Sequence, residues 1–185
     1  MIMERSRCVS LFLIGMFFCV AAQTGSAFAK DPGEGTKKIR ALNDQIVAAN
    51  ERRDLPAALH AAEEAVRVAK KEFGPDSLPA ADTMNNLANL YLYLKRAAEA
   101  ETLYKQAILI YLEKTDKEGV EMAAHYFNLG VAYAMEKKYA AAVNILNKAL
   151  IIRLKKLGPD NAETKNVEQM ITELTPLAYP NAEKI

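Results

Sequence analysis

A repeat of 42 residues is the feature of this sequence that most restricts what the chain can fold into. Alanine pairs, a Leu and Tyr pair and, at twice the interval, a Gly-Pro-Asp segment all recur in register. They are Ala58 and Ala65, Ala100 and Ala107, Ala142 and Ala149; Leu87 and Tyr91, Leu129 and Tyr133; and residues 74–76 and 158–160. A fixed period of about 20–50 residues is typical of a solenoid, in which each unit buries its apolar face against its neighbours.

Each period contains two amphipathic helical patterns joined by a short polar turn. Apolar residues follow helical spacing over 81–94 and again over 97–113, with Lys95 and Arg96 between them. Small alanines on the second helix allow the first helix to approach closely, so the pair is expected to form a helix hairpin. A glycine followed by proline, as at Gly74, ends the preceding helix.

The periodicity predicts an all-α solenoid of three helix hairpins and a closing helix. We expect hairpins over 39–73, 77–115 and 119–157, a closing helix over 161–175, a flexible leader over 30–38 and a C-terminal tail over 176–185. The leader is assigned from its glycine-rich and charged composition.

The first 29 residues have the three parts of a secretory signal peptide. Arg5 and Arg7 give a positive start, residues 9–22 form an apolar run, and Ala27 and Ala29 place small side chains before a cleavage point. We expect cleavage after Ala29 and a periplasmic or secreted protein. Retention as a membrane anchor is the alternative, although the run is shorter than the roughly 20 residues that a spanning helix needs.

The net charge and the few reactive side chains exclude several classes of partner and of catalytic site. Without residues 1–29 the chain has 22 basic and 22 acidic residues, a balance that argues against nucleic acid and anionic membranes as main partners. Both cysteines lie in that segment. The remainder has one serine, Ser77, and two histidines, His60 and His125, without the spacing of a catalytic triad, a metal site or a phosphate-binding loop. We therefore expect no enzyme activity, no cofactor, no metal and no membrane insertion after cleavage.

The later periods resemble the tetratricopeptide repeat, in the 42-residue variant found in kinesin light chains and many bacterial proteins. The resemblance rests on residues 84–91 (MNNLANLY), 98–108 (AEAETLYKQAI) and 128–133 (NLGVAY). It covers about residues 39–175, and the first period is degenerate. It implies a right-handed superhelix of helix pairs, whose first helices line a concave groove that commonly binds a peptide or a partner protein.

The resemblance also implies which side chains face that groove. By position they are Arg40, Asn43, Val47 and Asn50; Asp82, Asn85, Asn89 and Leu92; and Ala124, Phe127, Val131 and Ala134. Asn85 and Asn89 are one helical turn apart, and their amides suit the backbone of an extended peptide. The alternative is that both are simply solvated. Phe127 either forms an apolar pocket or packs on the adjoining helix.

One departure from the family concerns chaperone binding. Members that clamp the C-terminal carboxylate of cytoplasmic chaperones have Lys or Arg at these groove positions, where this chain has amides and apolar residues such as Asn43, Val47 and Val131. That activity is therefore not expected here.

We predict a non-catalytic, monomeric protein-interaction module that binds a peptide or partner protein in the groove, outside the cytoplasm. The alternative is a structural or self-associating component of an envelope or secretion assembly, in which copies stack end to end. The degenerate first repeat and the polar residues of 161–175 are typical of caps, which oppose such stacking.

Overall fold

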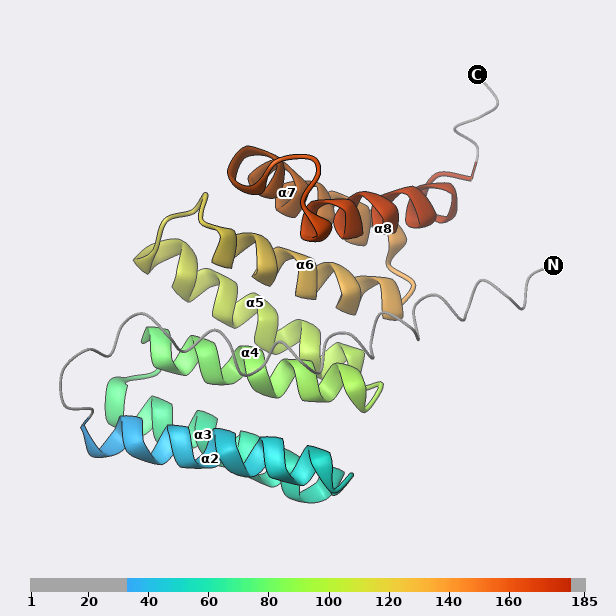
Figure 1. Ribbon diagram of the computed structural model, residues 1–185. Coiled ribbons are helices and arrows are strands. Elements are labelled where there is room, and N and C mark those ends of the chain that lie inside the picture. The colour runs from blue at the N-terminus through green and yellow to red at the C-terminus, as the bar shows by residue number, and fades with distance from the viewer. Residues whose placement is uncertain (1–32, 181–185) are drawn as a thin grey trace. The chain divides into compact units, whose positions relative to one another are not determined.

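Seven α-helices and no strands make up the part of the chain that the structure, a computed structural model, describes: residues 33–180. The chain divides into two compact units, Met1–Tyr93 and Leu94–Ile185. Unit 1 contains α2 (Glu34–Glu51), α3 (Leu55–Phe73) and α4 (Leu78–Tyr93). Unit 2 contains α5 (Ala97–Lys114), α6 (Val120–Met135), α7 (Tyr139–Leu157) and α8 (Ala162–Ala178) (Figure 1). The predicted all-α class is confirmed, and the predicted signal segment, 1–29, lies outside the described residues.

The first helix begins earlier than predicted. Because α2 starts at Glu34, residues 34–38 of the expected flexible leader are helical. The Glu34 carboxylate in the first turn of α2 complements the helix dipole. The ammonium group of Lys38, one turn later, lies 3.7 Å from this carboxylate. Gly35 is buried, and a Cβ there would lie 2.9 Å from the Cβ of Glu72 in α3. Close packing against the end of α3 therefore fixes the start of α2.

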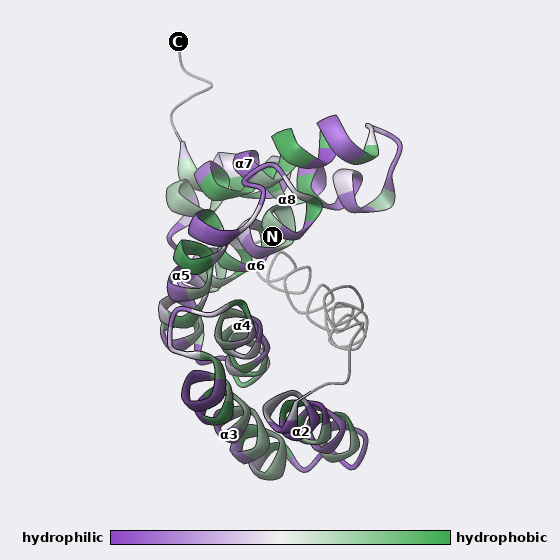
Figure 2. Ribbon diagram, turned by 90° about the vertical axis from the view of Figure 1, so that its left-hand side faces the viewer, coloured by the Kyte–Doolittle hydropathy of each residue, from purple (hydrophilic) through white to green (hydrophobic). Residues whose placement is uncertain are grey.

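Small side chains hold unit 1 together. α3 packs against both α2 and α4, and its buried face consists of alanine and valine. These residues are Ala58, Ala61, Ala62, Ala65, Val66, Val68 and Ala69. Hydrophobic and hydrophilic segments alternate along α2 and α3, as is typical of amphipathic helices (Figure 2). The recurring alanines thus have the predicted role, since they let neighbouring helices approach closely.

In unit 2 each helix packs against the next one along the chain, from α5 to α8. Ala142, Leu146 and Ala149 of α7 are each 0% exposed. Gly130 of α6 faces α7, and a Cβ at this glycine would come within 2.6 Å of the Leu146 side chain. α8 closes the unit as predicted and extends to Ala178. None of the helices in residues 33–180 is both long and apolar enough to cross a membrane.

The three hairpin turns share an unusual backbone conformation. Arg53, Lys95 and Lys137, each 42 residues apart, have φ angles of 58°, 60° and 60°. This left-handed region disfavours residues with a Cβ and costs glycine nothing. Gly74 and Gly158, which follow α3 and α7, also have positive φ angles, at helix ends where glycine was predicted. The hairpin turns therefore hold basic residues where glycine would be less strained.

Candidate partner-binding surfaces on the first helices of the repeats

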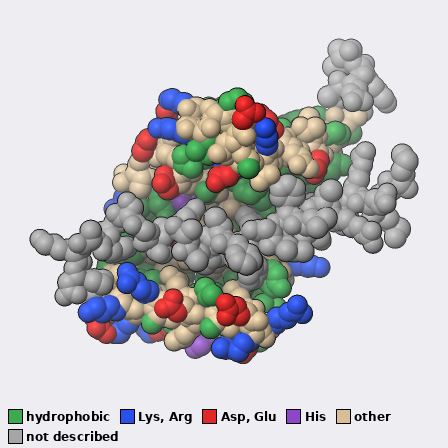
Figure 3. Space-filling model, viewed as in Figure 1, with side chains coloured by type: hydrophobic (Ala, Val, Ile, Leu, Met, Phe, Trp, Pro, Cys, Tyr) green, Lys and Arg blue, Asp and Glu red, His purple; other side chains and the backbone are tan. Residues whose placement is uncertain are grey.

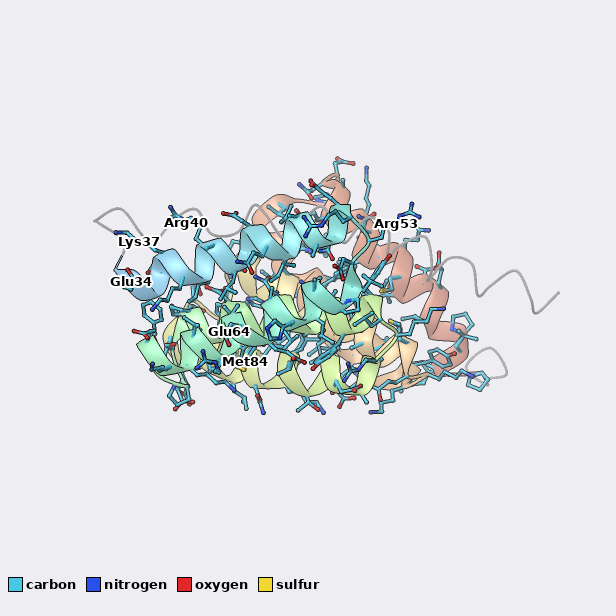
Figure 4. The ribbon with its side chains drawn as sticks, turned by 90° about the horizontal axis from the view of Figure 1, so that it is seen from below. Glu34, Lys37, Arg40, Arg53, Glu64 and Met84 are labelled. Atoms are coloured by element: carbon cyan, nitrogen blue, oxygen red, sulfur yellow. The ribbon has the colours of Figure 1, made fainter. Side chains whose placement is uncertain are left out.

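Two helices of unit 1, α2 and α4, contain most of the side chains predicted to face a partner. Of these, Arg40, Val47 and Asp82 are exposed, Asn43, Asn50 and Asn89 are half-buried, and Asn85 and Leu92 are buried. Arg40 extends away from the other helices of the unit (Figure 4). Basic and acidic side chains are intermingled over α2 (Figure 3). Unit 1 thus offers an accessible face of mixed polarity.

Asn85 and Leu92 are less accessible than a partner-facing position requires. Their exposed fractions are 6% and 0%. Asn85 and Asn89 each interact with another part of the protein. Asn89 remains the α4 amide that is partly open to a partner.

The side-chain amide oxygens of Asn43 and Asn50 in α2 lack hydrogen-bond donors. Both atoms are buried and accept no hydrogen bond within the described part of the chain. A buried acceptor without a donor costs about 1–3 kcal/mol. Asn43 and Asn50 therefore have unused hydrogen-bond acceptors on α2, which an N–H donor could satisfy.

In unit 2, α6 has a more apolar face at the corresponding positions. Phe127 and Ala124 are half-buried, whereas Val131 and Ala134 are 3% and 8% exposed. The guanidinium carbon of Arg153 in α7 lies 5.1 Å from the centre of the Phe127 ring. Phe127 therefore packs on the adjoining helix while part of its ring stays accessible. Val131 and Ala134 belong to the packing of the unit rather than to an open surface.

Arg153 was not singled out from the sequence, although it is a buried cation behind this face. It is 5% exposed, and its Nη1 donates to the backbone oxygen of Glu163 at 2.9 Å. Its Nη2 lies 3.3 Å from the Glu163 carboxylate. Tyr111 occupies the equivalent position one period earlier. The sequence could have indicated Arg153 through this replacement of an aromatic residue by a charged one. Arg153 joins α7 to the start of α8 and supports Phe127 from behind.

A second cluster missed from the sequence surrounds Glu101 in α5. Its carboxylate forms ion pairs with Lys105 and, at 2.6 Å, with Lys138, which also lies 3.0 Å from Glu136. Both lysines lie over the Tyr133 ring, at 5.4 and 5.9 Å. Burial opposes ionisation of Glu101, but the lysines outweigh it and lower its pKa to about 2. The cluster joins α5 to the turn between α6 and α7.

Of the three reactive side chains considered in the sequence, Ser77 and His125 serve the fold, and His60 is exposed. Ser77 donates to the backbone oxygen of Gly74 at 2.7 Å and accepts from the Ala80 N–H at 3.2 Å, which caps the start of α4. His125 is stacked on Tyr111, with ring centres 4.0 Å apart, and burial lowers its pKa to about 4. Within residues 33–180 no group of three or more His, Cys, Asp or Glu residues is arranged to hold a metal ion.

Comparison with protein families identifies the type of repeat in this chain. Two family models, both described as tetratricopeptide repeat, match residues 39–113 and 122–163. Together they cover more than half of the chain and reach from α2 to the start of α8.

The curated relatives are much longer proteins, of which this chain matches a small part. They include clustered mitochondria protein homologs from Coccidioides immitis and Aspergillus clavatus, which are 30% and 29% identical over 103 residues. Each match covers 56% of this chain, and the chain spans about 8% of the length of these relatives.

Solved structures share the fold at low sequence identity. The complex of the TPR2B domain of yeast Sti1 with pHsp70 aligns with a TM-score of 0.56 and 19% identity, over 75% of this chain and 97% of that chain. BtubC from P. vanneervenii aligns with a TM-score of 0.72 and 18% identity, over 98% of this chain and 70% of that chain.

Proposed function

Because the chain belongs to the tetratricopeptide repeat family, we propose that it is a non-catalytic protein-interaction module that binds a peptide or partner protein. The observation that carries the proposal is the accessible face of α2 and α4. Arg40 and Asp82 occupy equivalent positions in the two helices, as do Val47 and Asn89. Charge, amide and apolar groups on one face can contact both the backbone and the side chains of an extended segment.

The chemistry of the partner follows from the same side chains. The yeast Sti1 domain that shares the fold is in complex with pHsp70. In this chain amides and an apolar side chain occupy the predicted groove positions of unit 1, as at Asn43, Val47 and Asn89. We propose that the partner is held by hydrogen bonds to its backbone and by apolar contacts rather than through a terminal carboxylate.

A non-catalytic role is supported by what the reactive side chains contact. Ser77 caps α4, and the buried His125 stays neutral because burial lowers its pKa to about 4. A monomer is supported by α8, whose exposed residues include Lys165, Glu168 and Glu173. Such a polar outer face is typical of a capping helix, which argues against the alternative of a self-stacking envelope component.

We further propose that the protein acts outside the cytoplasm, on the basis of its signal-like residues 1–29. The expected product starts at Lys30. N-terminal sequencing of protein recovered from the periplasm or the medium tests this. A product that retains Met1 in washed membranes would contradict cleavage and favour an anchor.

Site-specific cross-linking tests the binding face. A photoreactive amino acid at Val47 or Asp82, both exposed, is expected to capture the same partner protein in living cells. The matched control is Asn144, an exposed residue on α7. If Asn144 gives the same products, or if Val47 and Asp82 give none, the face of α2 and α4 is not the binding surface.

A further inference from the structure

Basic residues at the hairpin turns have no role in the function proposed above. Arg53, Lys95 and Lys137 are exposed and in the left-handed backbone region, at equivalent positions in the three repeats. None of them forms an ion pair with another residue of 33–180. Glycine would relieve the backbone strain at each position, yet a long cationic side chain recurs. The fold does not require these charges.

In unit 2 the ion pairs bring two of these turns to one edge. Lys138, next to Lys137, reaches Glu101 in the second turn of α5, and α5 itself begins directly after Lys95 and Arg96. α5 and α7 both begin on the right-hand side in Figure 1. We call residues Lys95, Arg96, Lys105, Lys137 and Lys138 the turn edge of unit 2.

The acidic residues next to the turn edge are already paired with basic residues of the edge. Glu99 pairs with Arg96 at 2.8 Å, Glu136 pairs with Lys138 at 3.0 Å, and Glu101 pairs with Lys105 and Lys138. The charges of Lys95 and Lys137 are therefore not neutralised within the edge. Two exposed ammonium groups that lack a counter-charge are suited to a carboxylate supplied from outside.

We propose that the turn edge of unit 2 binds an acidic segment of a partner protein. Nucleic acids and anionic membranes are less suitable ligands, because both need many more basic residues than two lysines without a counter-charge. The proposal concerns a different surface from the face of α2 and α4. Its failure would leave the proposed function unaffected, and the cross-linking experiment above tests that function separately.

A charge-neutral variant tests the proposal with a fluorescein-labelled hexaglutamate peptide as the probe. In fluorescence anisotropy at low salt, the full chain with Lys95→Gln and Lys137→Gln is expected to bind about fivefold or more weakly than the natural chain. Lys70→Gln with Lys71→Gln removes the same charge from exposed positions on α3 and is expected to bind within about twofold of it. Replacing both turn lysines by arginine should preserve binding.

Two results would overturn the proposal. The first is an equal loss of affinity in the two glutamine variants, which would show general charge attraction. The second is unchanged peptide binding together with weaker binding of the turn variant to phosphatidylserine vesicles, which would assign the edge to membranes.

Discussion

Replacing Gly130 with valine is expected to lower the free energy of unfolding by about 2–3 kcal/mol. A Cβ at this position would lie 2.6 Å from Cγ and Cδ2 of Leu146 and 3.3 Å from Cγ2 of Ile145. Leu146 is 0% exposed, so it can move aside only against the side chains that surround it. Valine and glycine differ little in helix propensity, so steric crowding between α6 and α7 dominates. Urea unfolding followed by circular dichroism measures the change.

A double substitution identifies the cause. Leu146→Ala alone should cost about 2–5 kcal/mol, because it leaves a cavity next to Gly130. In that background Gly130→Ala should become stabilising by up to about 1 kcal/mol, since the new Cβ fills space and alanine is the better helix former. If Gly130→Ala has the same effect in both backgrounds, crowding against Leu146 is not the reason for the glycine.

The second large effect is a loss of stability in acid that depends on His125. Burial lowers its pKa from 6.5 to about 4 in the folded chain. The unfolded state therefore binds the proton more readily, so the stabilisation is fully present above pH 6.5 and is lost as the pH falls through 4. Its size is about 3 kcal/mol. Free energies of unfolding measured from pH 7.5 to 3.5 should follow this curve.

His125→Phe is the matched variant, because it keeps a ring against Tyr111 and removes the titration. Its stability should change much less between pH 6.5 and 4. Glu101 acts in a lower range: its pKa of about 2 lies below the ordinary 4.5, so its contribution is present above pH 4.5 and is lost as the pH falls through 2. An unchanged slope in His125→Phe between pH 6.5 and 4 would mean that another group titrates there.

The hairpins could be predicted because their signal is local and repeated. Ala58, Ala100 and Ala142 recur at one interval, and each is 0% exposed. The start of α2 could not be predicted in this way. It depends on the approach of Gly35 to Glu72, a residue on another helix, whereas the local glycines and charges favour a flexible leader.

Site chemistry was less predictable for a related reason. The sequence places Asn85 and Asn89 one turn apart, but burial differs along the helix, and only the structure shows that Asn85 is 6% exposed. The ion pair of Glu101 joins α5 to the turn before α7, and that of Arg153 joins α7 to α8. Exposed and paired charges look identical in a sequence, so their partners appear only when the helices are packed.

Calorimetric titration of the cross-linked partner, once identified and purified, tests the central claim most directly: α2 and α4 present a peptide-binding face. Asn89→Ala should weaken binding about tenfold or more, because the loss of a hydrogen bond in a desolvated contact costs about 1–3 kcal/mol. Its melting temperature should stay close to that of the natural chain. Asn144→Ala, the same change at an exposed position of α7, should bind with unchanged affinity. Equal affinities for the natural chain and both variants would contradict the claim.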